Sequence, residues 1–122
     1  MKIERFEDME VWQLTRKLVK EVYEVTENTK FSRDIDLKRQ MRRSGISILS
    51  NISEGFERRS NKEFVYFLFV SKGSAGELRS QICIAKDLNF INENLFNSLT
   101  EELIVISKSL SGLIKYLKKT EI

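Results

Sequence analysis

The sequence predicts an all-α protein, an antiparallel up-down-up-down four-helix bundle that forms a single domain over residues 1–122. Three observations support this fold class. The chain contains no proline, its apolar residues recur three or four positions apart along four long segments, and only short polar segments separate these. Long amphipathic helices joined by short loops pack as antiparallel neighbours, so a bundle is expected.

The first helix is expected to start after Asp8, a candidate N-terminal cap, and to end near Glu27. Its apolar stripe follows helical spacing and consists of Val11, Leu14, Leu18, Val22 and Val25. The polar residues from Asn28 to Ser32 then predict the first loop.

The second helix is expected to begin near Arg33 or Asp34, with Ser32 as a candidate cap. Gly55 is expected to end it, because glycine readily adopts the left-handed conformation that stops helices. A polar seam with heptad-like spacing runs along this helix and consists of Gln40, Ser44, Ser47, Asn51 and Glu54. A polar track this regular is expected to border a helix contact.

The third helix is expected to run from a capping box, Ser60 to Glu63, to about Leu88. One of its tracks alternates steps of four and three and suits a bundle core: Phe64, Leu68, Ser71, Ala75, Leu78, Ile82 and Ala85. A second track has large residues at its ends and small ones in its middle: Tyr66, Phe69, Gly73, Gly76, Ser80 and Ile84. Glycine inside a helix costs about 1 kcal/mol relative to alanine, so two of them indicate that another backbone comes close. We expect a subunit interface there, and an extra contact within the bundle is the alternative.

The fourth helix is expected to follow a turn at 89–94, with Asn92 or Asn94 as its cap. Its core stripe is Leu99, Leu103, Ile106, Leu110, Leu113 and Leu117. Lys115, Lys118 and Lys119 lie near its end, where cations interact favourably with the helix dipole.

Positive charge is concentrated in one window of the chain. The whole sequence has 21 Lys and Arg against 18 Asp and Glu, whereas the window from Arg33 to Lys62 has eight basic and four acidic residues, a net charge of +4. Seven of these residues are candidates for binding the phosphates of nucleic acid: Lys38, Arg39, Arg42, Arg43, Arg58, Arg59 and Lys62. Their spacing contains no base-reading pattern, so such binding would be directed at the backbone and sensitive to salt. The alternative is a solvated helix face with ion pairs.

The composition excludes several kinds of catalytic site. Without histidine, a hydrolytic triad or an Arg–His ribonuclease site cannot form, and the single Cys83 cannot build a disulfide or a multi-thiolate metal site. There is no Gly-rich phosphate-binding loop. We therefore expect a protein that is not an enzyme and that needs no cofactor or metal. A divalent-ion nuclease that uses Glu54 and Glu77 is a weaker alternative.

A cytoplasmic location without a membrane partner is expected. The first ten residues are rich in charge and lack the apolar core of a signal peptide. The longest apolar run, Phe64 to Val70, has seven residues, and a membrane span needs about 20.

The stretch from Gln40 to Gly55 reads Q-M-R-R-S-G-I-S-I-L-S-N-I-S-E-G. It resembles the pattern Q-hydrophobic-R-R-A-x-x-S-I-P-x-N-I-A-E-G of small bacterial four-helix bundle proteins called 23S rRNA intervening-sequence proteins. The likeness continues to residues 73–78 and also includes residues 6–12, so it covers nearly the whole chain. Leu49 stands where the family often has Pro, and Ser44 and Ser53 stand where Ala is usual.

This resemblance implies a ring-shaped homopentamer. It also implies kinship with the accessory variability proteins of diversity-generating retroelements, which look like basic pentameric barrels that bind nucleic acid and a reverse transcriptase. The family label itself establishes neither an activity nor a ribosomal role.

Two hypotheses of function follow. The leading one is a non-enzymatic homo-oligomer, a pentamer, whose arginine-rich surface binds RNA or DNA backbones. The alternative is a structural or adaptor protein that binds another protein, such as a reverse transcriptase, through the polar seam and the exposed aromatic residues.

Overall fold

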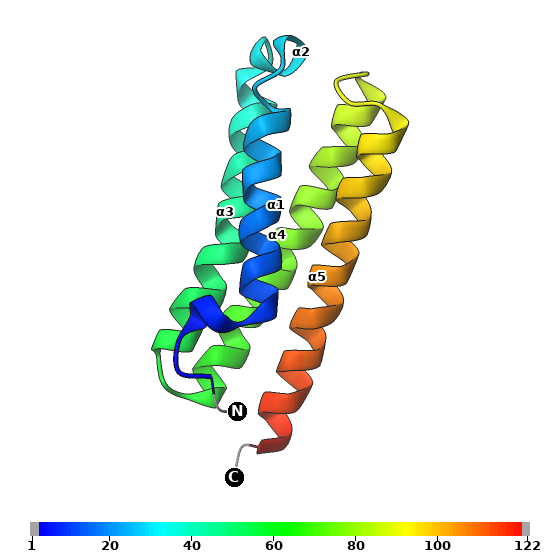
Figure 1. The fold of residues 1–122 in the computed structure, drawn as a ribbon. Helices are drawn as coiled ribbons and strands as arrows, with labels where there is room; N and C mark the ends of the chain where they lie inside the picture. Colours follow the sequence, from blue (N-terminus) through cyan, green and yellow to red (C-terminus); the bar gives the residue numbers. More distant parts are fainter. Residues whose placement is uncertain (1–2, 121–122) are drawn as a thin grey trace.

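The computed structural model describes residues 3–120 as a bundle of four long helices that lie side by side (Figure 1). A single 3-10 turn, η1 (Phe6–Asp8), precedes the helices α1 (Glu10–Val25), α2 (Thr29–Ser32), α3 (Ile35–Glu57), α4 (Asn61–Asp87) and α5 (Glu93–Thr120). The chain runs in alternating directions through α1, α3, α4 and α5, which confirms the predicted bundle. The α3–α4 contact is the most extensive, and α1 packs more extensively on α3 than on α5.

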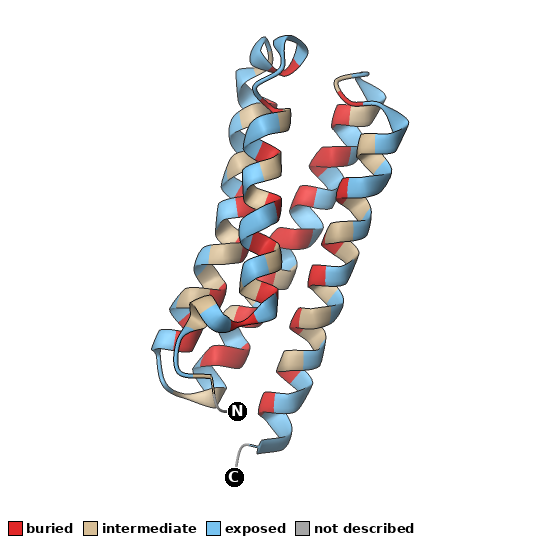
Figure 2. Ribbon diagram, viewed as in Figure 1, coloured by how far each residue is buried: buried red, intermediate tan, exposed pale blue. Residues whose placement is uncertain are grey.

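The apolar stripes predicted from the sequence form the core, and the buried residues lie on the sides of the helices that face one another (Figure 2). One position of the fourth stripe is shifted, because Ile114 is buried and the expected Leu113 is only half-buried. No helix within residues 3–120 is long and apolar enough to cross a membrane.

The start of α1 differs from the prediction. Asp8 lies in η1 and does not cap the helix, whose N-cap position is taken by Met9. Met9 is buried, so apolar packing rather than a side-chain cap fixes this end of α1. Farther along, the Trp12 indole Nε1 donates a hydrogen bond of 3.0 Å to Ser53 Oγ and ties α1 to α3.

The segment from 28 to 32, expected as a loop, contains one helical turn. Asn28 Oδ1 accepts a hydrogen bond of 2.9 Å from the amide of Phe31, whose ring is fully buried 5.1 Å from that of Phe90. Ser32 belongs to this turn, so the expected cap of the next helix is wrong. Asp34 caps α3 instead and accepts from the amide of Leu37 at 3.0 Å.

The prediction that Gly55 ends the second helix is also wrong. Helix α3 continues to Glu57, and no glycine has a positive φ; the left-handed residue after the helix is Arg59, with φ 59°. Gly55 is needed for space instead. A Cβ there would lie 2.8 Å from Phe67 Cβ and 2.9 Å from Phe64 Cδ1, so α4 passes too close for any side chain.

The caps of the last two helices agree with the sequence. Ser60 Oγ accepts from the amide of Glu63 at the start of α4, which is one of the two bonds of the predicted capping box, and the Glu63 carboxylate pairs with Arg58. Asn92 Oδ1 accepts from the amide of Leu95 at 2.8 Å, which makes Asn92 the cap of α5.

Candidate nucleic-acid interface

The polar seam predicted on the second helix lies along the contact between α3 and α4. Ser47 Oγ and Ser74 Oγ are 2.8 Å apart, and Asn51 Nδ2 donates to the carbonyl oxygen and the hydroxyl of Ser47. Ser71 Oγ, from α4, donates to the carbonyl oxygen of Ile48 at 2.9 Å. These hydrogen bonds satisfy polar groups inside the helix contact, so the middle of the seam is occupied by structural interactions.

Charged partners lie on either side of this middle part of the seam. Ser44 Oγ donates to Glu77 Oε1 at 3.4 Å, and Glu54 is held by Arg58. Ser47 thus lies across from Ser74, and Ser44 lies across from Glu77. The same antiparallel register sets the exposed Gln40 across from Gln81. Gln81 is buried, and its Oε1 has no hydrogen-bond partner among the described residues.

Arg42 is built into the bundle. Its Nε donates to Thr26 Oγ1 at 2.9 Å, its Nη2 donates to the carbonyl oxygen of Tyr23 at 3.2 Å, and the same nitrogen pairs with Glu27. The guanidinium carbon lies 4.3 Å from the centre of the Tyr23 ring. With only 18% of its side chain exposed, Arg42 joins α3 to the end of α1 and is not free to bind a phosphate.

Lys38 is also occupied by Glu27. Its Nζ lies 3.4 Å from Glu27 Oε1. The hydrogen bond from Arg42 and the charge of Lys38 together lower the pKa of Glu27 below its ordinary value. Glu27 therefore stays ionised and keeps both cations paired at neutral pH.

The two arginines after α3 pack on aromatic rings. Arg58 pairs with Glu54 at 2.9 Å and with Glu63 at 3.4 Å, and its guanidinium lies 5.0 Å from the centre of the Phe67 ring. Arg59 has no carboxylate partner within residues 3–120, but its guanidinium lies 5.0 Å from the Phe56 ring centre. Among the seven predicted phosphate-binding residues, only Arg39, Arg43 and Lys62 are exposed with neither a carboxylate nor an aromatic partner in the described part of the chain.

The outer face of α4 carries the second track of residues that the sequence predicts for the third helix. We call it the α4 stripe: Tyr66, Phe69, Gly73, Gly76, Ser80 and Ile84. All six are exposed in the single chain, Tyr66 to 63% and Phe69 to 49%. A Cβ added at either glycine would meet nothing within 4 Å, so no part of the chain within residues 3–120 covers the middle of the stripe.

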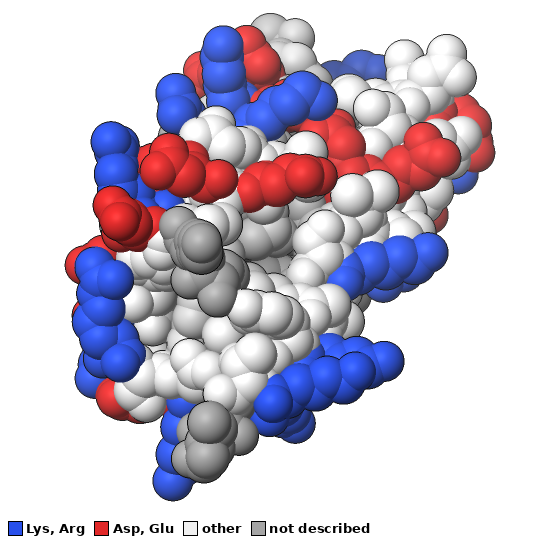
Figure 3. Space-filling model, turned by 60° about the horizontal axis from the view of Figure 1, so that its bottom comes forward, with Lys and Arg blue, Asp and Glu red and all other residues white. Residues whose placement is uncertain are grey.

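Another group of cations was not predicted as a binding surface. Lysines gather where the first part of α4 lies beside the last part of α5: Lys72, Lys108, Lys115, Lys118 and Lys119. Figure 3 views the molecule toward this end and shows Lys and Arg side chains at its lower right, with a band of acidic side chains across its upper part. The sequence does contain a signal for this group, because no carboxylate occurs at 103–120. The net charge of the window from Arg33 to Lys62 does not include this segment.

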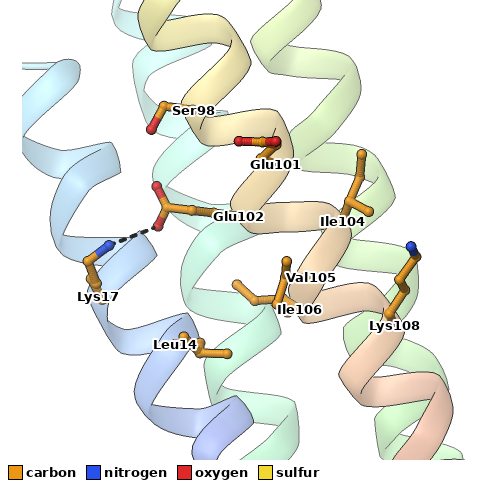
Figure 4. Close-up of a pocket in the computed structure, with 9 residues that line it drawn as sticks. All are labelled: Leu14, Lys17, Ser98, Glu101, Glu102, Ile104, Val105, Ile106 and Lys108. Carbon is orange, nitrogen blue, oxygen red and sulfur yellow. Dashed lines mark ion pairs between the residues drawn. The ribbon is translucent and has the colours of Figure 1, made fainter.

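A groove of about 700 Å³ lies along α5 toward α1 (Figure 4). At one side of it, Lys17 Nζ lies 3.6 Å from Glu102 and 3.5 Å from Glu21. Burial, and after it the neighbouring Glu21 carboxyl, raise the pKa of Glu102 to about 7, against the opposing effect of Lys17. Within residues 3–120 no group of three or more His, Cys, Asp or Glu side chains could hold a metal ion.

Comparisons with known proteins agree with this fold. A solved structure from Bacteroides thetaiotaomicron, a protein with unknown function from the S23 ribosomal protein family, superposes with a TM-score of 0.79 at 22% identity. The match covers 86% of this chain and 98% of that one. No curated protein matches the sequence. The model of the 23S rRNA-intervening sequence protein family matches residues 7–112, as the motif around Gln40 to Gly55 predicted. The chain belongs to the 23S rRNA-intervening sequence protein family.

Proposed function

We propose that this protein is a homo-oligomer, assembled through the α4 stripe, that binds the phosphate backbone of RNA or DNA and catalyses no reaction. The α4 stripe is the observation that carries the proposal. From Phe64 to Gly76 the helix contains one charge, Lys72, and its outer side presents two aromatic rings to water. An exposed apolar stripe of this length is typical of a surface that another protein chain covers.

The two glycines support a second copy of a helical chain as the cover. Each exposed glycine inside a helix costs about 1 kcal/mol relative to alanine, and nothing in the same chain explains either position. Small residues in mid-helix allow a neighbouring helix to approach closely, while Tyr66 and Phe69 supply buried area at one end.

The number of copies rests on the resemblance, which implies a ring of five. Five chains of formal charge +3 each would bring about +15 to one assembly. Weak phosphate contacts on separate subunits then act together, because the second contact made on one strand is an intramolecular event.

The oligomer is tested by the native mass in solution. We expect five times 14.4 kDa. Gly76→Glu places a charge in the α4 stripe and should release the monomer. Gly112→Glu is the matched control, since Gly112 is also an exposed helical glycine with nothing within 4 Å. A wild-type monomer would overturn the assembly, and a dimer formed by two antiparallel α4 stripes would overturn the ring.

Nucleic-acid binding is tested with a labelled single-stranded RNA of about 30 nucleotides and a DNA duplex of similar length. We expect both to bind at low salt and affinity to fall steeply between about 50 and about 200 mM salt, because each phosphate contact releases a counterion. Absent binding at low salt, or affinity that does not depend on salt, would overturn the proposal and favour the protein-binding adaptor.

A further inference from the structure

We propose that the phosphates bind to the lysine face, which consists of Lys72, Lys108, Lys115, Lys118 and Lys119, and not principally to the arginines of α3. This inference rests on the proposed nucleic-acid binding and assigns it to a different surface from the one that the sequence favours.

The lysine face combines two helical segments that contain lysine and no carboxylate. Residues 37–53 of α3 also contain four cations and no acid, but two of them, Lys38 and Arg42, pair with Glu27. Leu103–Thr120 contains four lysines and no acid, and Phe64–Gly76 contains one lysine and no acid, a total of +5. The Asn61 side chain, in the first turn of α4, donates to the carbonyl oxygen of Leu117 and to the hydroxyl of Thr120. This contact places the two acid-free segments side by side at one end of the bundle.

These lysines are also free of ion pairs, judged over residues 3–120. Lys38, Arg42 and Arg58 must each give up a carboxylate before they can bind a phosphate, which offsets part of the gain. Lys108, Lys115 and Lys119 are exposed and have no such partner. Lys118 has no carboxylate either, and its Nζ lies over the ring of Phe69 at 5.3 Å. A lysine without an ion pair loses only water and counterions when it binds a phosphate.

The spacing of the lysines suits an extended polyanion. Lys108, Lys115 and Lys119 follow one another after seven and four residues, so they lie on one face of α5. Eleven residues at 1.5 Å give a row about 16 Å long. Along one nucleic-acid strand that length corresponds to roughly five steps of 3.4 Å, so one strand can reach all three ammonium groups.

The row favours nucleic acid over an anionic membrane surface. Helices that lie on membranes combine cations with a broad apolar face that enters the lipid. The positions between these lysines include Ser111 and Gly112, which offer nothing to insert, and Tyr116, a single exposed aromatic residue that does not make a broad apolar face. Lysines alone, without a base-reading side chain among them, predict binding that depends on salt and not on sequence.

The test compares two variants with the same change of charge. The first carries Lys108→Gln, Lys115→Gln and Lys119→Gln, and the control carries Arg39→Gln, Arg43→Gln and Lys62→Gln. All six residues are exposed and without ion-pair partners in the described chain, so neither set should disturb the fold. The native mass and the thermal midpoint of both variants are measured first, so that only intact assemblies are compared.

Binding of the labelled RNA is then measured over a salt series. We expect the lysine variant to lose at least tenfold in affinity. Its salt slope should fall by about 2 for each subunit that the strand contacts, at roughly 0.7 for each of three lost contacts. The control should lose less than threefold. An equal loss in both variants, or a larger loss in the control, would overturn the lysine face while leaving the proposed function intact.

Two further outcomes separate the inference from its alternatives. If the wild-type protein binds no nucleic acid, the proposed function fails, and the lysine face fails with it. Vesicles that contain phosphatidylserine are the second probe. If the lysine variant keeps its affinity for RNA but loses the vesicles, the row is a membrane surface and the inference is overturned.

Discussion

The cations of α3 and those of the lysine face differ in what surrounds them. In the α3 region Lys38 and Arg42 share Glu27, and Arg58 lies between Glu54 and Glu63. On the lysine face no carboxylate occurs in either helical segment. Of the eight cations in the window, three are paired with carboxylates, whereas none of the five lysines has a carboxylate partner within residues 3–120.

The difference shows that charge along the sequence and charge on the surface are separate quantities. Arg42 and Arg58 hold helix ends together through geometry that needs a guanidinium, with several donors and a flat face for an aromatic ring. On the lysine face Lys118 contacts the ring of Phe69, and Lys108, Lys115 and Lys119 are exposed without ion pairs within residues 3–120. The two internal arginines and these three surface lysines are thus used differently.

The largest effect is expected at Gly55, where α3 meets α4 beside Arg58 and its partners. Gly55→Ala would place a Cβ 2.8 Å from Phe67 Cβ, and both atoms are fixed by helical backbone. The helices must separate, and we expect a loss of about 2 kcal/mol in the free energy of unfolding, after a helix-propensity gain of about 1 kcal/mol is included. Denaturant unfolding monitored by circular dichroism measures it.

Gly112→Ala is the control for that substitution. It lies on the side of the lysine face, where a Cβ meets nothing within 4 Å, so only the gain in helix propensity remains. We expect it to stabilise by about 0.5–1 kcal/mol. Similar effects of the two substitutions would show that α3 and α4 do not approach each other as closely as the structure has them.

The next effect separates two adjacent arginines. Arg42→Gln removes the bonds to Thr26 and to the carbonyl oxygen of Tyr23 and the pair with Glu27, and we expect a loss of about 1.5 kcal/mol. Arg43→Gln, at an exposed position without such partners in the described chain, should change stability by less than about 0.5 kcal/mol.

Arg42→Lys sharpens the result. A lysine cannot reproduce the fork of donors or the flat contact with the Tyr23 ring, so it should recover little of the lost stability. Full recovery by lysine would mean that charge alone matters at this position, and the contrast between the internal arginines and the surface lysines would lose its basis.

Most of the fold could be predicted from the sequence because it depends on local patterns. Stripes three or four residues apart, the Ser60 cap and the absence of proline each report on their own helix, and the structure contains all four helices. The prediction for Gly55 is wrong because a glycine can either end a helix or make room for a neighbouring helix. Only the distance to Phe67 on another helix shows which of the two applies. The helical turn at Phe31 was missed for a related reason, since that ring is buried against the distant Phe90.

The candidate site was less predictable, because whether a cation is free depends on residues far away in the sequence. Glu27 lies 15 residues before Arg42, so no window around the arginine would reveal their pair. The α4 stripe was easier to find. Its exposure follows from one helix having two apolar sides, and that property is visible in the spacing alone.

The smallest effect concerns the acidic part of α5, which precedes the lysine row. The pKa of Glu102 is about 7 in the folded protein against an ordinary value of 4.5, because burial and then the Glu21 carboxyl disfavour its charge. A raised folded-state pKa means that the folded protein binds the extra proton. Stability should therefore fall as pH rises from 4.5 to about 7 and then level off.

Glu102→Gln removes this titration, so the variant should lose less stability than the wild type between pH 5 and pH 8, a difference of less than about 1 kcal/mol because the site is partly solvated. Thermal midpoints across that range measure it. Glu27, whose pKa is lowered, acts below 4.5 and does not interfere. If the two proteins show the same pH dependence, Glu102 is ionised in the folded protein over the whole range from pH 5 to pH 8. The acidic part of α5 would then carry the charge that its sequence suggests, as the lysine row does.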